Sequence, residues 1–126
     1  MKGIVITTKN EMRVQEFSKP VHKSIGDAVG GWIEVVHPKR LEYPYCMVVN
    51  EEGVLRKLPI NSFGSFLYGT DTHGWPIAGD AVLMKEGYNS DGKLDILGLD
   101  EQDIKYLCDM VSTVSSGDIK LEQEAE

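Results

Sequence analysis

The fold is decided by three apolar segments: WIEVV at residues 32–36, YCMVVNEEGVLRKLPIN at 45–61 and WPIAGDAVLM at 75–84. Each segment is rich in β-branched or other apolar residues, and turn-forming residues separate them. Residues 45–50 are predicted to form a central strand, because their side chains are apolar on both faces. We expect the remaining segments to lead into this sheet and to cover it.

The N-terminal part of the chain predicts a hairpin and a short helix. Residues 2–8 form a β-branched run, and residues 12–17 alternate apolar and polar side chains as a returning strand does. Ser24 is a candidate cap for a helix over residues 25–29, which a glycine pair ends. The chain then enters the strand at 32–36, where Glu34 should point to solvent or to a partner.

The middle of the chain predicts a second hairpin and a short helix. Gly53 is expected to supply a positive φ, so that residues 54–58 return antiparallel to the central strand. Residues 62–68 carry aromatic and leucine side chains at helical spacing. Residues 81–84 form an apolar strand, and the polar residues 85–93 are expected to be a loop or the tip of a hairpin.

The clearest helix begins at Asp100, which has N-cap character and is followed by acids in the first turn. Gly117 is expected to end it, and residues 116–126 form an acidic tail. The predicted fold is therefore α+β, with a single domain over residues 1–115. It has a single, mostly antiparallel sheet of five to six strands, short helices and one C-terminal amphipathic helix. The apolar stripe of that helix consists of Ile104, Leu107, Cys108, Val111 and Val114.

Composition narrows the classes of function. The net charge is −7, with +2 on residues 1–60 and −9 on residues 61–126. This balance argues against general binding of nucleic acids or membrane surfaces, and it places any anionic ligand on the N-terminal half. The chain has no apolar leader and no membrane-length apolar run, and Cys46 and Cys108 lie in apolar segments. We expect a cytoplasmic protein with two buried thiols.

Paired basic residues occur at two places, Lys39-Arg40 and Arg56-Lys57, on either side of the predicted central strand. Folding of the second hairpin can bring both pairs to one edge of the sheet. Arginine there is suited to gripping phosphate or carboxylate through bidentate hydrogen bonds. The alternative interpretation is that all four side chains are solvated surface charges.

Two aromatic residues and two asparagines complete this candidate site. The aromatic rings come from polar loops nearby and are able to stack on a base, although they also suit a core or an interface. The asparagines lie at strand ends, where their amides commonly bond the local backbone. The predicted ligand-binding residues are Arg40, Asn50, Arg56, Lys57, Asn61, Tyr68 and Trp75.

Signals for catalysis and cofactors are weak. His73 follows Asp71 in a glycine-bounded loop, and such a pair is able to do acid–base work, but it is equally an ordinary polar loop. The glycines of GDAVGG at 26–31 suggest a phosphate cradle, yet ending a helix explains them better. No histidine or cysteine spacing indicates a metal site. We expect no catalytic residue, no metal and no cofactor.

The central segments resemble a family of small proteins of unknown function found in bacteriophages and mobile elements. The resemblance rests on GGWIEVV, VVNEEG, LPIN and IAGD, and it is most specific over residues 30–84. It implies an accessory protein in the cytoplasm of a bacterial host. No catalytic residue is established for that family, so the resemblance assigns no catalytic residue to this chain.

We therefore expect non-catalytic binding that counteracts a host defence. The protein would either sequester a small anionic, nucleotide-like ligand or bind a host protein, and we expect a homo-oligomer. The alternatives are a small hydrolase that uses His73 with Asp71, and a regulatory or structural protein.

Overall fold

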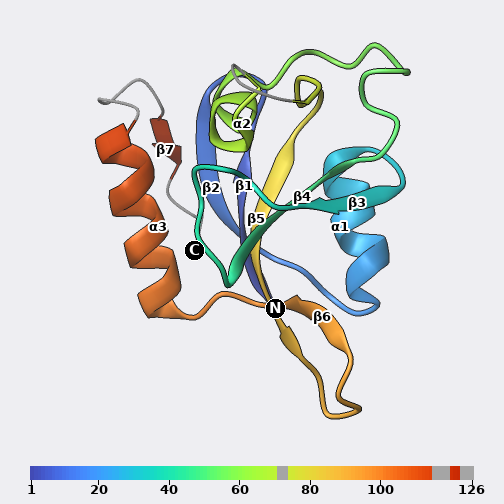
Figure 1. Cartoon of the computed structure of the whole chain (residues 1–126), viewed down its shortest axis with the longest axis vertical. Helices are drawn as coiled ribbons and strands as arrows, with labels where there is room; N and C mark the ends of the chain where they lie inside the picture. The colour runs from blue at the N-terminus through green and yellow to red at the C-terminus, as the bar shows by residue number, and fades with distance from the viewer. Residues whose placement is uncertain (71–73, 115–119, 123–126) are drawn as a thin grey trace.

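The computed structural model describes residues 1–70, 74–114 and 120–122, in which seven strands form one sheet with helices on both faces (Figure 1). The strands are β1 (Lys2–Ile6), β2 (Glu11–Glu16), β3 (Ile33–Val36), β4 (Tyr45–Asn50), β5 (Ala81–Tyr88), β6 (Leu94–Leu97) and β7 (Lys120–Glu122). The helices are α1 (Val21–Val29), α2 (Ser62–Tyr68) and α3 (Glu101–Val114).

The strand order is β3-β4-β5-β1-β2-β7, and β6 pairs with the second half of β5. Every pairing among the described strands is antiparallel except that of β2 with β7. The predicted α+β fold with one mostly antiparallel sheet is thus confirmed. Of the predicted acidic tail, only the backbone of β7 is described, and Gly117 lies outside the described residues.

The sheet is buried on both faces, which explains the continuous apolar run of β4. Side chains alternate along each strand, so that Cys46 and Val48 face α1, whereas Met47 and Val49 face the layer that contains α2 and α3. Burying each large aliphatic side chain contributes about 1.5–3 kcal/mol. The position of β4 between β3 and β5 confirms that it is a central strand.

The predicted return strand over residues 54–58 is wrong, because the chain makes successive turns after β4. The Arg56 N–H donates to the Glu52 carbonyl at 2.8 Å, and the Leu58 N–H donates to the Gly53 carbonyl at 3.0 Å. Both sides of β4 are already paired, with β3 and with β5, so that no place remains in the sheet for such a strand.

Gly53 is required for a reason other than the one expected. Gly53 does not adopt a positive φ. The residue in this turn that does so is Lys57, with φ of 57°. A Cβ atom on Gly53 would lie 2.4 Å from the Ala78 carbonyl oxygen. The glycine therefore allows the turn after β4 to pack directly against the backbone of the segment before β5.

The predicted loop over residues 85–93 is wrong in its first half, because β5 continues to Tyr88 and β6 returns antiparallel. The true turn is short, and the Asn89 side-chain oxygen accepts the backbone N–H groups of Asp91 and Lys93 at 2.9 and 3.1 Å. This end of β5 contains Lys85 and Glu86, and its polar composition concealed the strand.

The first helix begins earlier than predicted, since α1 starts at Val21 with Pro20 at its N-cap. Ser24 lies inside the helix, where its hydroxyl faces the Val21 carbonyl at 3.5 Å. The helix ends as expected, because Gly30 takes a left-handed conformation with φ of 88°.

Asp103 fixes α3 to the sheet. Its carboxylate accepts the Tyr45 hydroxyl at 2.8 Å, the Lys85 ammonium at 2.6 Å and the Asp100 N–H at 3.0 Å. Asp100 caps the helix in return, because its carboxylate accepts the Asp103 N–H at 2.7 Å. Burial acts to raise the pKa of Asp103, but these hydrogen bonds outweigh it and lower the pKa from 3.8 to about 2.

We predict that Asp103→Asn lowers the free energy of unfolding by about 2 kcal/mol at neutral pH, because the depressed pKa measures how strongly folding stabilises the carboxylate. This contribution is complete above the unfolded-state pKa near 4 and is lost as the pH falls toward 2. Urea unfolding of both proteins from pH 7 to pH 2 measures it. Asp109→Asn, on an exposed position of the same helix, is the control. A stability difference that persists unchanged at pH 2 would contradict the assignment.

Candidate functional site

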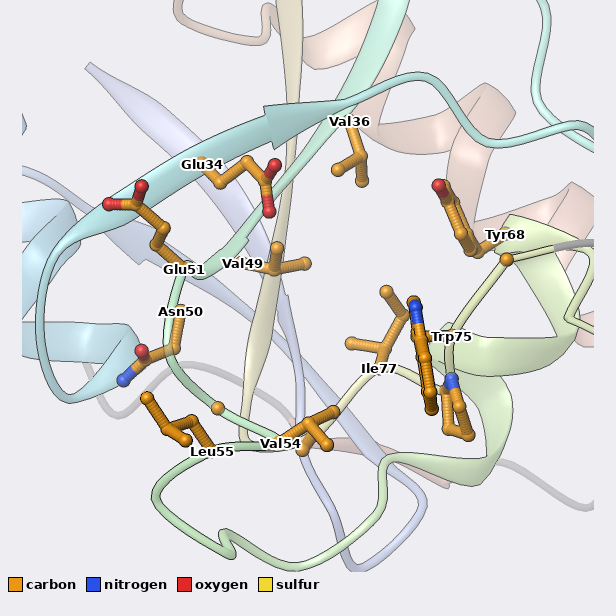
Figure 2. Close-up of a pocket in the computed structure, with 14 residues that line it drawn as sticks. Glu34, Val36, Val49, Asn50, Glu51, Val54, Leu55, Tyr68, Trp75 and Ile77 are labelled. Carbon is orange, nitrogen blue, oxygen red and sulfur yellow. The ribbon is translucent and has the colours of Figure 1, made fainter.

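A pocket of about 480 Å³ opens between the β3–β4 hairpin and the segment that contains Trp75 (Figure 2). Three parts of the chain build it: the two strands with the turn that follows them, the end of α2, and residues 74–78. Together these walls decide which ligands the pocket can hold.

The strand wall is made by Glu34 and Val36 of β3 with Val49 of β4. Glu34 and Val49 are cross-strand partners, and Val36 lies two residues from Glu34, so that all three side chains share one face. Figure 2 shows the Glu34 carboxylate pointing into the pocket, whereas that of Glu51 points away from its centre. This wall therefore combines apolar surface with negative charge.

The opposite wall contains Tyr68, Trp75 and Ile77 (Figure 2). Trp75 is 79% exposed, whereas Ile77 is buried. Hydrogen bonds fix the backbone here, because the Ile77 N–H donates to the Ser65 hydroxyl at 2.9 Å and its carbonyl accepts the Asn61 N–H at 2.8 Å. The tryptophan is thus an exposed ring on a fixed support.

The third side of the pocket, at its mouth, is the turn after β4, which presents Val54 and Leu55. Both side chains are strongly exposed, at 48% and 78%. The close packing of Gly53 on Ala78 brings this turn against the Trp75 wall. The sequence prediction missed these residues, although two consecutive apolar residues beside the glycine of a polar turn were a visible signal.

Asn61 is fully buried and joins three parts of the chain. Its side-chain NH₂ donates to the Ile6 carbonyl at 2.8 Å and to the Gly79 carbonyl at 3.0 Å. Its side-chain oxygen accepts the Gly64 N–H at 2.8 Å and so caps α2. Asn61 therefore holds the Trp75 wall in place, and its amide has no exposed surface to offer a ligand.

Asn50 also bonds the backbone while it lines the pocket. Its amide donates to the Val29 carbonyl at 3.1 Å, and its oxygen accepts the Glu52 N–H at 2.8 Å. Of the predicted ligand-binding residues, the structure brings Asn50, Tyr68 and Trp75 together around this pocket.

The predicted meeting of the two basic pairs at one edge is wrong. Arg40 precedes β4 and Arg56 follows it, so that the pairs lie at opposite ends of that strand. The Arg40 guanidinium donates to the Phe66 carbonyl at 2.7 Å and lies 4.4 Å from the centre of the Phe66 ring. Neither of these arginines, nor Lys57, lines the pocket.

Arg56 borders a second, shallower hollow of about 900 Å³, on the side of the sheet that α1 covers. Its guanidinium donates to the Gly30 carbonyl at 3.2 Å, next to the exposed ring of Trp32. His22 and Lys23 also line this hollow. The glycines that suggested a phosphate cradle are here, but the N–H groups of Gly30 and Gly31 both donate to the Gly26 carbonyl.

Chemical groups for catalysis are sparse in the described part of the chain. Burial, with a smaller contribution from the Glu86 carboxylate, raises the pKa of Cys46 to about 12, so that its thiol is not a nucleophile at neutral pH. His37 pairs with Glu86 away from the pocket. No cluster of three metal-ligating side chains occurs among the described residues. Asp71 and His73 lie outside them, so the hydrolase hypothesis is untested.

The fold defines the class: a small α+β domain built on one mostly antiparallel sheet. The chain belongs to the DUF3846 family, a domain of unknown function, whose family model matches residues 1–112. The prediction that the chain belongs to a family of unknown function is thus confirmed, whereas an origin in bacteriophages or mobile elements stays a prediction. Neither a curated protein nor a solved structure matches the chain. In the described residues, no helix is long and apolar enough to cross a membrane.

We predict that Asn61→Ala lowers the free energy of unfolding by about 3 kcal/mol, since it removes a helix cap and leaves buried backbone groups without partners. Chemical denaturation followed by circular dichroism measures the loss. Asn89→Ala, in the turn between β5 and β6, is the matched control and should cost about 1 kcal/mol. Equal losses in the two variants would show that Asn61 does not anchor the pocket wall.

Proposed function

We propose that this protein acts by binding another protein, without catalysis, through the pocket beside Trp75. The observation that carries the proposal is the group of exposed apolar side chains at the pocket mouth, Val54, Leu55 and Trp75. Exposed apolar surface of this kind, rimmed by polar residues, is typical of protein interaction sites. Tryptophan on a rigid backbone is also the residue type that most often dominates binding energy.

The charge of the pocket supports a basic protein partner over a nucleotide. Glu34 and Glu51 line it, and no lysine or arginine does so in the part of the chain that the structure describes. A phosphate group there would meet like charge, whereas a lysine or arginine would meet its opposite. Of the two ways of binding expected from the sequence, recognition of a host protein is the one that suits this pocket.

The resemblance of the central segments to proteins of bacteriophages and mobile elements supports a biological setting for this binding. In our proposal, the chain is an accessory protein of such an element and acts in the cytoplasm of the bacterial host. Its partner is a host protein, and blocking that protein counteracts a defence.

A second candidate function is the sequestration of a small anionic ligand in the hollow beside Arg56. Arg56 and Lys23 supply positive charge there, and the Trp32 ring is exposed for stacking. The opposing carboxylates of Asp27 and Glu52 in the same lining make this the weaker candidate.

We predict that Leu55→Ser weakens capture of a host protein at least about tenfold, because it replaces an exposed apolar anchor at the pocket mouth. Immobilised protein is exposed to a bacterial host lysate, and captured proteins are quantified by mass spectrometry. Leu94→Ser is the matched control, because that leucine is also exposed but lies on β6, away from the pocket. A captured protein that both variants retain equally would not be bound through this pocket.

For the second candidate, calorimetry with linear and cyclic nucleotides should give heat with the unaltered protein and none with Arg56→Ala, because the guanidinium is the main cation of that hollow. Lys93→Ala, in the turn between β5 and β6, is the control for loss of one positive charge. The absence of heat with every nucleotide would remove this candidate and leave protein binding.

A further inference from the structure

One edge of the sheet is open at β3. This strand ends the strand order, and in the part of the chain that the structure describes no strand pairs with its outer side. The Glu51 N–H donates to the Trp32 carbonyl at 2.8 Å, which makes these two residues a hydrogen-bonded pair just before β3. Because such pairs alternate along an antiparallel ladder, the backbone groups of Ile33 and Val35 point away from β4.

The sequence of β3 does little to block pairing at this edge. Native edges are commonly protected by lysine, proline or a bulge. β3 contains none of these, and its register with β4 runs without interruption over all four residues. Its single charge, Glu34, projects from one face and leaves the backbone edge accessible. An extended segment could therefore form a new ladder with Ile33 and Val35.

Each face of β3 borders a hollow. Glu34 and Val36 line the Trp75 pocket, whereas Ile33, with the preceding Trp32, lines the hollow beside Arg56. The side chains of a strand added to this edge would point alternately to the two faces. Such an arrangement, a free backbone edge with side-chain pockets beside it, is the one that strand addition uses for affinity and specificity.

Charge identifies the occupant. Glu34 and Glu51 lie on the face of the Trp75 pocket, where no lysine or arginine is among the described lining residues, whereas in the other hollow Asp27 and Glu52 are balanced by Lys23 and Arg56. Antiparallel pairing of β3 with a second copy of itself through Ile33 and Val35 would bring two Glu34 carboxylates to the same face, directly opposite each other or two residues apart, where like charges repel. A segment with lysine or arginine at alternate positions would instead pair with Glu34.

We propose that β3 adds an extended, basic segment of a partner protein as a new strand of the sheet, with alternate side chains in the two hollows. The proposal rests on the proposed protein-binding function and names the way in which the partner is held. The lysine or arginine that enters the Trp75 pocket packs its aliphatic stem on the apolar wall and directs its charge toward Glu34.

The test uses an alternating valine–lysine peptide of about seven residues, the length of an ordinary strand. We expect it to bind the full chain and to slow amide hydrogen exchange of Ile33 and Val35 about tenfold, measured by NMR. A valine–glutamate peptide should not bind. A valine–lysine peptide that is N-methylated at alternate residues should also fail, because it cannot donate to the sheet edge.

Charge reversal supplies the matched variants. Glu34→Lys should weaken binding of the valine–lysine peptide about tenfold, because it places like charge at the pocket wall. Glu42→Lys reverses an exposed charge outside both hollows and should leave binding unchanged. Amide spectra of both variants confirm that the fold is retained.

Three results would overturn the proposal. The first is no binding of the valine–lysine peptide, and the second is equal binding of its N-methylated form with unchanged exchange at Ile33 and Val35. The third is self-association through β3, seen by sedimentation and abolished by Val35→Pro, which would make a second copy the occupant. The protein-binding function itself is tested separately, by comparing capture of host proteins between the Leu55→Ser and Leu94→Ser variants. Strand addition can therefore fail while the protein-binding function holds, and the two outcomes are distinguishable.

Discussion

The structure depends most on the buried amide of Asn61. This one side chain bonds the end of β1, the segment before β5 and the first turn of α2, and its bond to Ile6 of β1 spans 55 residues along the chain. A buried amide is costly unless it is hydrogen-bonded, so the three parts must be in place together for it to be satisfied. The wall that presents Trp75 is therefore part of the folded core, although the tryptophan itself is almost fully exposed.

Two features of the structure support the proposed binding surface. The contact of Gly53 with Ala78 brings an apolar turn against the Trp75 wall, and the strand order leaves β3 at the edge beside it. In the proposed function, the negative charge of Glu34 favours a partner with a basic group over one that carries phosphate. Fold, pocket and charge thus support the same kind of function, the recognition of a protein segment.

The sequence predicted the elements whose signals are local and dense. The first hairpin, β4 and α3 were predicted because apolar spacing, turn residues and an N-cap are all visible in a few residues.

Residues 54–58 were misjudged because their alternation resembles that of an edge strand, whereas Val54 and Leu55 are exposed in a turn. The same error misplaced the basic pairs. A returning strand would have brought Arg56 back toward Arg40, but the two pairs lie beyond opposite ends of the six-residue strand β4. The structure brings Tyr68 and Trp75 together around the pocket. Glu34 was expected to point to solvent or to a partner, but no local pattern reveals that it lies opposite the Trp75 segment.

The most direct test of the central claim is residue-resolved amide hydrogen exchange on the free protein. If Asn61 makes the pocket wall part of the core, the amides of Gly64 and Ile77 will exchange only through global unfolding, as slowly as that of Val82 in β5. The edge amides of Ile33 and Val35 will exchange much faster. Exchange at Gly64 and Ile77 that is as fast as at this edge would contradict the claim, because it would show that the wall opens independently of the core.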